Sequence, residues 1–209
     1  DIINDRPVTD IGSTAFSGLT SLTNIAIPDS VTNIGSYAFQ LCTGLSSVTI
    51  PGSITHIGNS AFSGCTSLNS VTISNSVASI GDFAFNGCTS LTNIEFGNSV
   101  TSIGSVAFQS CSSLTSVTLP NSVTNIEASA FNGCTSLTAI TVDPLNPVYS
   151  SVAGVLLNGS RTKVLFCPWG KAGNYVIPAG VTDVADYAFQ ACTSLSSVAI
   201  PGSITNIGN

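Results

Sequence analysis

Apolar residues recur along this chain with a fixed spacing of 23 residues. An exact period of this length is typical of repeat proteins, in which each unit packs mainly on its two neighbours. We therefore expect a repeat solenoid of about eight stacked coils. The Val or Ile that opens each unit falls at Val8, Val31, Ile54, Val77, Val100, Val123, Val181 and Ile204.

Within one unit, the apolar pattern predicts two short strands and a compact turn. Leu68, Val71 and Ile73 end in period-two alternation, which is typical of a half-buried strand. The V-T-x-I segment gives a second extended stretch, and A-F-x-x-C has the spacing of a single helical turn with Phe and Cys facing inward. One unit cannot bury these residues alone, so neighbouring strands about 4.8 Å apart are expected to form one continuous core.

The repeat is interrupted once. We expect one solenoid domain over residues 1–209, with regular coils at 8–145 and 181–209 and an enlarged coil at 146–180. The chain stops within a unit, so it is expected to be a fragment of a longer array.

The enlarged coil contains a hairpin signal. Residues 154–166 hold two apolar runs on either side of Asn158 and Gly159, a pair that favours a tight turn between two strands. A β-hairpin is therefore expected to replace the usual turn and helical segment of this coil. The regular strand pattern returns at Tyr175, Ile177 and Pro178.

The consensus I-G-x-x-A-F-x-x-C-T-S-L-x-x-V-T-I-P-x-S-V resembles the BspA-like leucine-rich-repeat family over essentially the whole chain. The resemblance implies an α/β-type leucine-rich-repeat solenoid, made mainly of short β-strands with short helical turns. It also implies secreted or surface-anchored proteins that bind host or matrix proteins or other cells. It implies no common enzymatic activity.

Charge excludes one class of partner. Charged residues make up 7% of the chain, and four Lys plus Arg against ten Asp plus Glu give a net charge of −6. Too few cations are present for a basic patch that would bind nucleic acid phosphates. No apolar run reaches the length of a membrane span.

The cysteines are interpreted as core residues. In a ladder, neighbouring Cβ atoms lie near 5 Å apart, whereas a disulfide prefers about 3.8 Å. Leu19 occupies the same register, which suggests an apolar position, and buried thiols act as small hydrophobes. Cys167 lies outside the register and is the best candidate for a reactive or paired thiol, although packing is favoured there too. The ladder comprises Cys42, Cys65, Cys88, Cys111, Cys134 and Cys192.

Catalysis, cofactors and metals find no support in the sequence. No C-x-x-C pair occurs and His56 is the only histidine, so no metal site is predicted. None of the common nucleophile, zinc-protease, dinucleotide or phosphate-loop motifs is present. Asp183 and Asp186 form the closest acidic pair, and solvated surface is the preferred interpretation of both. We expect no catalytic residue and no cofactor.

Outward-facing residues of the L-x-x-V-x-I strands are the first candidate for partner binding. In the leucine-rich-repeat fold these strands line the concave side, where the outward positions would form flat polar columns. Such columns suit hydrogen bonds to a peptide or a glycan. The candidates are Ser70, Thr72, Asn93, Glu95, Ser116 and Thr118.

The enlarged coil is the second candidate. It holds three of the four cations, Arg161, Lys163 and Lys171, and the only tryptophan, Trp169. Trp and Arg are enriched at binding hot spots, so these residues could form a protruding recognition element. The alternative is that Trp169 covers the local core and the cations keep the hairpin soluble and its edge unpaired.

The predicted function is a non-catalytic binding or adhesion module of an extracellular or cell-surface protein. Its partner would be a protein or glycan on a host, matrix or neighbouring cell. A purely structural spacer is the alternative. A remote alternative is binding to ice or another ordered surface through a threonine column. It is remote because Thr is common at exposed strand positions for its strand propensity alone. That column comprises Thr9, Thr32, Thr55, Thr101, Thr124 and Thr182.

Overall fold

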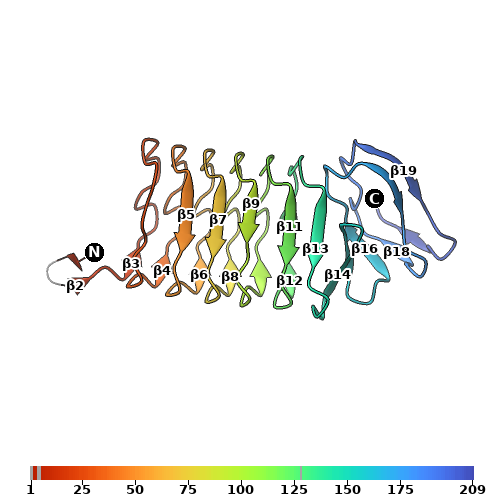
Figure 1. Ribbon diagram of the computed structural model, residues 1–209, viewed down its shortest axis with the longest axis horizontal. Helices are drawn as coiled ribbons and strands as arrows, with labels where there is room; N and C mark the ends of the chain where they lie inside the picture. Colours follow the sequence, from red (N-terminus) through yellow and green to blue (C-terminus); the bar gives the residue numbers. More distant parts are fainter. Residues whose placement is uncertain (1, 4–5, 128) are drawn as a thin grey trace.

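The computed structural model describes residues 2–3, 6–127 and 129–209 and shows successive turns of chain stacked along one axis (Figure 1). Long strands run along one side of the stack and short strands along the other, and the core lies between them. The predicted solenoid is therefore confirmed. A small antiparallel hairpin, β1 (Ile2–Ile3) with β2 (Arg6–Pro7), precedes the first turn.

The V-T-x-I segments form a sheet of six parallel strands, which we call the short-strand sheet. Each strand has two residues, and the second is directed into the core in most of them. Paired residues such as Ser102 and Asn125 are 23 positions apart, so the sequence period is also the register. The strands are β3 (Asp10–Ile11), β4 (Asn33–Ile34), β6 (His56–Ile57), β8 (Ser79–Ile80), β10 (Ser102–Ile103) and β12 (Asn125–Ile126).

The L-x-x-V-x-I segments form the opposite side, which we call the long-strand face. Side chains alternate between exposed and buried, as in the Ser-Val-Thr-Ile sequence of β7. β5, β7 and β9 pair in parallel, and so do β11 and β13. The strands are β5 (Ser47–Ile50), β7 (Ser70–Ile73), β9 (Asn93–Glu95), β11 (Ser116–Leu119) and β13 (Ala139–Val142).

The helical turns expected at A-F-x-x-C were wrong, because the described residues contain no helix. The segment is a series of tight turns in which left-handed residues recur, for example Tyr37 at φ 61° and Leu41 at φ 58°. A right-handed helix needs negative φ throughout. The left-handed residues turn their N–H groups along the axis, so that Tyr37 donates to Asn59 O at 2.9 Å and Leu41 to Ser63 O at 2.8 Å.

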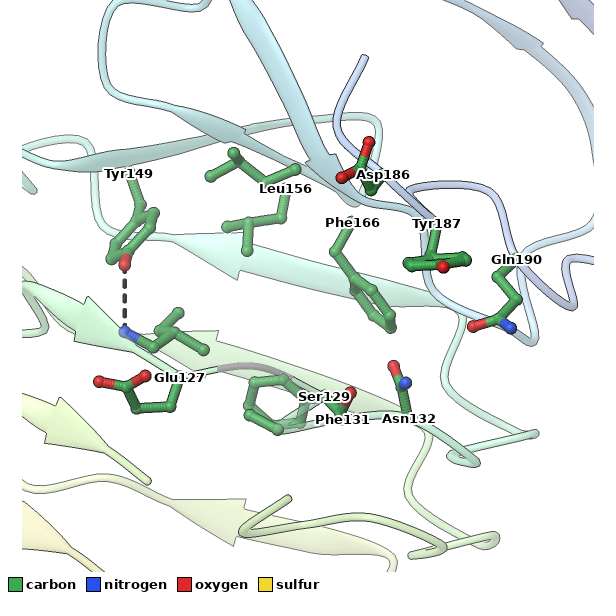
Figure 2. A pocket seen from close by; sticks show the side chains of 13 residues that line it. Glu127, Ser129, Phe131, Asn132, Tyr149, Leu156, Phe166, Asp186, Tyr187 and Gln190 are labelled. Atoms are coloured by element: carbon green, nitrogen blue, oxygen red, sulfur yellow. Dashed lines mark hydrogen bonds between the residues drawn. The ribbon is translucent and has the colours of Figure 1, made fainter. Parts of the chain in front are cut away.

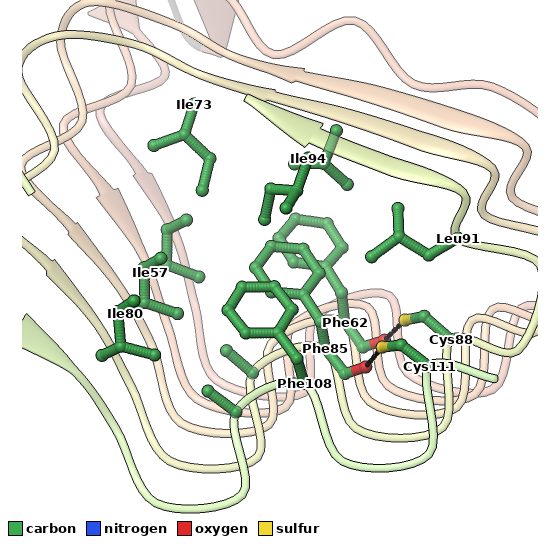
Figure 3. Packing of buried hydrophobic residues seen from close by; sticks show 14 of the residues in the cluster. Ile57, Phe62, Ile73, Ile80, Phe85, Cys88, Leu91, Ile94, Phe108 and Cys111 are labelled. Atoms are coloured by element: carbon green, nitrogen blue, oxygen red, sulfur yellow. Dashed lines mark hydrogen bonds between the residues drawn. The ribbon is translucent and has the colours of Figure 1, made fainter. Parts of the chain in front are cut away.

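Phenylalanine rings form a continuous stack through the regular turns. Successive centroids lie 5.2 to 5.5 Å apart, with interplanar angles of 4° to 7°. Figure 3 shows three of these rings packed between the isoleucines of both strand sets and the cysteines. The stacked rings are those of Phe16, Phe39, Phe62, Phe85, Phe108 and Phe131.

The enlarged coil contains the predicted hairpin and one more. β15 (Val155–Asn158) and β16 (Lys163–Phe166) are antiparallel around the turn at Gly159. β14 (Tyr149–Val152) also pairs with β15, through a turn in which Ala153 and Gly154 have φ 49° and 81°.

After the hairpins, the parallel order resumes. β16 pairs with β18 (Asp183–Val184), which pairs with β20 (Asn206–Ile207). β17 (Gly173–Val176) pairs with β19 (Leu195–Ala199). The core is not continuous as expected: a second cluster forms here, and β15 is the boundary, with Leu156 in the first cluster and Leu157 in the second.

Candidate functional site

The six candidates on the long-strand face are all exposed and lie on three successive strands. Between β7 and β9, Ser70 is the direct Cα partner of Asn93, and Thr72 is that of Glu95. Ser116 and Thr118 hold the equivalent positions of β11, which contacts β9 but pairs with β13. The structure therefore brings these side chains together on one polar surface, in which Glu95 is the only charge among the six.

A shallow groove of about 530 Å³ lies beside this surface. Asn93, Glu95 and Thr118 belong to its lining, and Asp143 adds a second carboxylate. β9 departs from the consensus here, because Phe96 takes the usual aliphatic position and meets the Phe108 ring edge-on at 5.8 Å. The groove thus combines polar strand residues with an apolar floor.

The four candidates of the enlarged coil do not form one cluster. Arg161 is exposed in the turn between β15 and β16, and Lys163 faces Asp183 in the β16–β18 register. Trp169 and Lys171 lie in the following turn, where Gly170 N–H donates to Leu137 O at 2.8 Å. The hairpin strands themselves are packed into the core, since Val155, Leu157 and Val164 are fully buried.

Lys171 contacts two other segments of its own coil. Its ammonium donates to the carbonyl of Ala153 at 2.6 Å and lies 5.7 Å from the ring centroid of Tyr175. It therefore ties the turn of the first hairpin to β17. Trp169 is half-buried.

Hydroxyl side chains connect each turn to the one before it. Thr101 Oγ1 donates to Ala78 O at 3.0 Å, and Thr32, Thr124 and Thr182 donate in the same way at 3.2 to 3.4 Å. On the long-strand side, Ser46 Oγ donates to Thr23 O at 3.0 Å. Many Ser and Thr hydroxyls thus form hydrogen bonds between coils. The pattern of polar and apolar positions in the sequence does not indicate this role.

The ladder cysteines are free thiols that also donate hydrogen bonds. Cys88 Sγ donates to Phe62 O at 3.2 Å, and Cys42, Cys65, Cys111 and Cys134 contact the preceding turn's Phe carbonyl at 3.0 to 3.2 Å. Burial raises the pKa of Cys65 to about 12. The side chain is therefore more than a small hydrophobe: it serves a carbonyl inside the core.

Two observations modify the sequence interpretation of the cysteines. Leu19, used to identify the register as apolar core, is 47% exposed and so does not support that inference. Cys167 is fully buried, and its pKa is raised mainly by a hydrogen bond with the Cys192 side chain and by burial. The partner Cys192 is only half-buried, and the same hydrogen bond together with Lys171 lowers its pKa. Cys192 is thus the more accessible thiol of the pair.

Sequence reasoning missed a pocket of about 560 Å³ where the repeat is interrupted. Figure 2 shows Glu127, Phe131 and Asn132 along one wall, with Phe166, Tyr187 and Gln190 across from them. The full lining is Ile126, Glu127, Ser129, Ala130, Phe131, Asn132, Tyr149, Leu156, Leu165, Phe166, Asp186, Tyr187 and Gln190.

Tyr149 connects the two walls of this pocket. Its hydroxyl accepts the backbone N–H of Ile126 at 3.1 Å, which leaves its own proton free to donate. Burial raises the pKa of Tyr149, and the nearby Glu127 carboxylate adds to the shift. The signal for this pocket in the sequence is the absence of the A-F-x-x-C motif between residues 146 and 180.

Across residues 2–3, 6–127 and 129–209, no group of three or more His, Cys, Asp or Glu side chains could hold a metal ion. In the same described part of the chain, no helix has the length and apolar character needed to cross a membrane.

Comparison with solved structures gives several similar proteins. A leucine rich cell surface protein of Faecalibacterium prausnitzii shares 32% identity and a TM-score of 0.74, over 98% of this chain and 62% of that one. A leucine-rich repeat protein of Eubacterium ventriosum shares 26% identity and a TM-score of 0.60, over 79% and 50%. The pneumococcal vaccine antigen PcpA, at 24% identity and a TM-score of 0.79 over 100% and 55%, has a similar fold.

The chain thus spans less than two-thirds of the length of each of these proteins. No curated protein matches its sequence. A family model described as a BspA type leucine rich repeat region matches with six copies, over residues 1–77, 61–152 and 163–209. The repeat, the stacked turns and this match together place the chain in the BspA-type leucine-rich-repeat family.

Proposed function

We propose that the chain is a non-catalytic binding module of a secreted or cell-surface protein. Its partner is a protein or a glycan on a host, matrix or neighbouring cell, and the long-strand face makes the main contact. A similar protein described as a cell surface protein supports the location.

One observation carries the proposal. The candidate side chains on β7, β9 and β11 are exposed and free of bulky apolar groups, and those of β7 and β9 are paired in register, so they present hydrogen-bonding groups at strand spacing. Rigid elements hold binding groups more accurately than loops do. Glu95 and Asp143 give the adjoining groove a negative charge, which favours a partner with complementary charge.

The test places charge on this face. Thr72→Lys together with Thr118→Lys is expected to weaken binding to immobilised matrix proteins, host-cell monolayers or a glycan array by at least about tenfold. Asn33→Lys together with Asn206→Lys is the matched control, because both asparagines are exposed on the short-strand side. If both double variants bind as the unmodified protein does, the long-strand face is not the binding surface.

A structural spacer is the second candidate, supported by the rod-like regular turns (Figure 1). A spacer predicts no saturable binding to any of these surfaces. It also predicts that loss of whole coils changes the reach of the protein without changing any affinity.

A further inference from the structure

The pocket where the repeat is interrupted lies at the end of the phenylalanine stack. Phe108 stacks on Phe85 and on Phe131, but among the described rings Phe131 stacks only on Phe108. Phe189, the next phenylalanine in register, instead contacts Tyr175 at 6.1 Å and a 49° tilt. The enlarged coil contributes no A-F segment, so no ring continues the stack.

A shortened connection explains the gap. Val164 pairs with Val184 and Gly173 with Leu195, yet the first residues of these pairs are nine positions apart and their partners eleven. The chain therefore passes from β16 to β17 without making the usual turn. The space of the missing turn is the pocket.

One wall carries unpaired backbone donors. In four successive regular turns of the described chain, three N–H groups donate to the next turn, as Phe83, Phe85 and Gly87 do at 2.8 to 2.9 Å. The corresponding N–H groups of Ser129 and Phe131 donate to no group in the described part of the chain.

The opposite wall carries unpaired acceptors. At the positions equivalent to Asp186 and Gln190, the carbonyls of Asp82 and Gln109 accept N–H groups from the preceding turn. Here Cys167 N–H reaches Ala188 O at 2.7 Å, but the carbonyls of Asp186 and Gln190 accept nothing from the residues that the structure describes. The donor-bearing and acceptor-bearing residues thus line opposite walls of the same pocket.

The charge of the pocket is negative. Glu127 and Asp186 line it, and the lining contains no Lys, Arg or His. The exposed ring of Tyr187 and the half-buried ring of Phe166 provide faces over which a cation is attracted. The volume of about 560 Å³ is within the range of ligand sites.

We propose that this pocket is a docking site for an extended, lysine- or arginine-bearing segment of a partner polypeptide, which takes the place of the missing turn. The segment accepts hydrogen bonds from Ser129 and Phe131 and donates to Asp186 and Gln190, as an added strand does at an open sheet edge. Its basic side chain lies by the Glu127 and Asp186 carboxylates. This inference rests on the proposed binding function and adds a second surface to it.

The test uses a short acetylated peptide in which lysine alternates with phenylalanine, measured by fluorescence anisotropy on the full chain. Glu127→Gln together with Asp186→Asn is expected to weaken binding by about tenfold or more. Both changes keep the oxygens that accept from Asn125 Nδ2 and from Asn209 N–H, so folding is retained. Asp82→Asn is the matched control, since Asp82 Oδ1 accepts Ser105 N–H in the same register of a regular turn.

Amide hydrogen exchange locates the peptide. Bound peptide is expected to slow exchange at Ser129 and Phe131, and N-methylation of the peptide is expected to abolish binding. A peptide with glutamate in place of lysine should not bind. The proposal is overturned if a neutral oligosaccharide protects these amides and the lysine peptide does not, or if the double variant binds the peptide unchanged.

The experiments distinguish failure of the pocket proposal from failure of the proposed function. If the peptide does not bind but Thr72→Lys with Thr118→Lys still reduces binding to matrix proteins or cells, the long-strand face stands and the pocket proposal falls. If the peptide binds and the long-strand variants have no effect, the pocket is the binding site and the long-strand face is not.

Discussion

The regular array, residues 8–145, and the interrupted region, residues 146–209, are built from the same repeat but differ in how well their turns fit. In the regular array, aromatic rings stack at 5.2 to 5.5 Å with angles of 4° to 7°. In the interrupted region, Tyr175 and Phe189 meet at 6.1 Å and 49°. The hydrogen bonds that the thiols donate are longer there too: the Sγ-to-oxygen distance is 3.2 Å at Cys88 and 3.5 Å at Cys192.

This difference shows what identical neighbours contribute. Each turn has donors on one side and acceptors on the other, and only a turn with the same geometry satisfies both. Where one turn differs, its neighbours keep unsatisfied backbone groups and an opening in the core. The irregular unit is therefore where a chain of this kind gains a pocket without losing its fold.

The largest expected effect is removal of a ring from the stack. Phe85→Ala should lower the free energy of unfolding by about 3–5 kcal/mol, because a fully buried ring with two stacked neighbours is lost. Phe189→Ala, at a half-buried ring with one tilted contact, should cost clearly less. Denaturant titration measures both. Equal costs would mean that the two regions are packed equally well.

The second prediction concerns close approach between turns. A Cβ on Gly97 would overlap the carbonyl oxygen of Ser74, so Gly97→Ala should destabilise the protein by about 1–3 kcal/mol. Gly52→Ala is the matched control, since a Cβ there meets nothing within 4 Å. Thermal unfolding compares the two variants. A Gly97→Ala protein as stable as the control would show that adjacent turns can move apart freely.

The third prediction uses the raised thiol pKa. Below about pH 9 the Cys65 thiol is protonated in both states, so its contribution to stability is fully present. As the pH rises from 9.0 toward about 12, the unfolded chain releases a proton that the folded chain keeps, so the free energy of unfolding falls. The free energy of unfolding, measured by urea titration at each pH across this range, should fall less steeply for Cys65→Ala. Parallel slopes would place the thiol in contact with water.

The smallest expected effect separates two serines in the same register. Ser122 Oγ donates to Val100 O at 2.7 Å, whereas the exposed Ser99 hydroxyl has no partner among the described residues. Ser122→Ala should cost about 1 kcal/mol, and Ser99→Ala nearly nothing. Differential scanning calorimetry resolves the pair. Equal losses would show that the hydroxyls do not connect the coils.

The sequence predicted the solenoid, both strand sets and the hairpin, because burial in a repeat follows directly from the apolar period. It did not predict the turn geometry: Tyr37 and Val106 have left-handed φ, which no side-chain pattern reveals outside glycine. The pocket depends on a connection two residues shorter than its neighbour, and that difference appears only once the strands are paired. The polar columns remain a prediction of a binding surface.

The 23-residue register also determines how such a chain tolerates insertions and deletions. Adding or removing a whole unit in the regular array recreates every contact between the new neighbours, since strand partners lie 23 positions apart and the other bonds between turns recur with the same period. A one-residue change within a strand would instead move its buried side chains to the exposed face. Duplication can therefore lengthen the rod freely, while the single irregular coil stays at a fixed place relative to its own two neighbours.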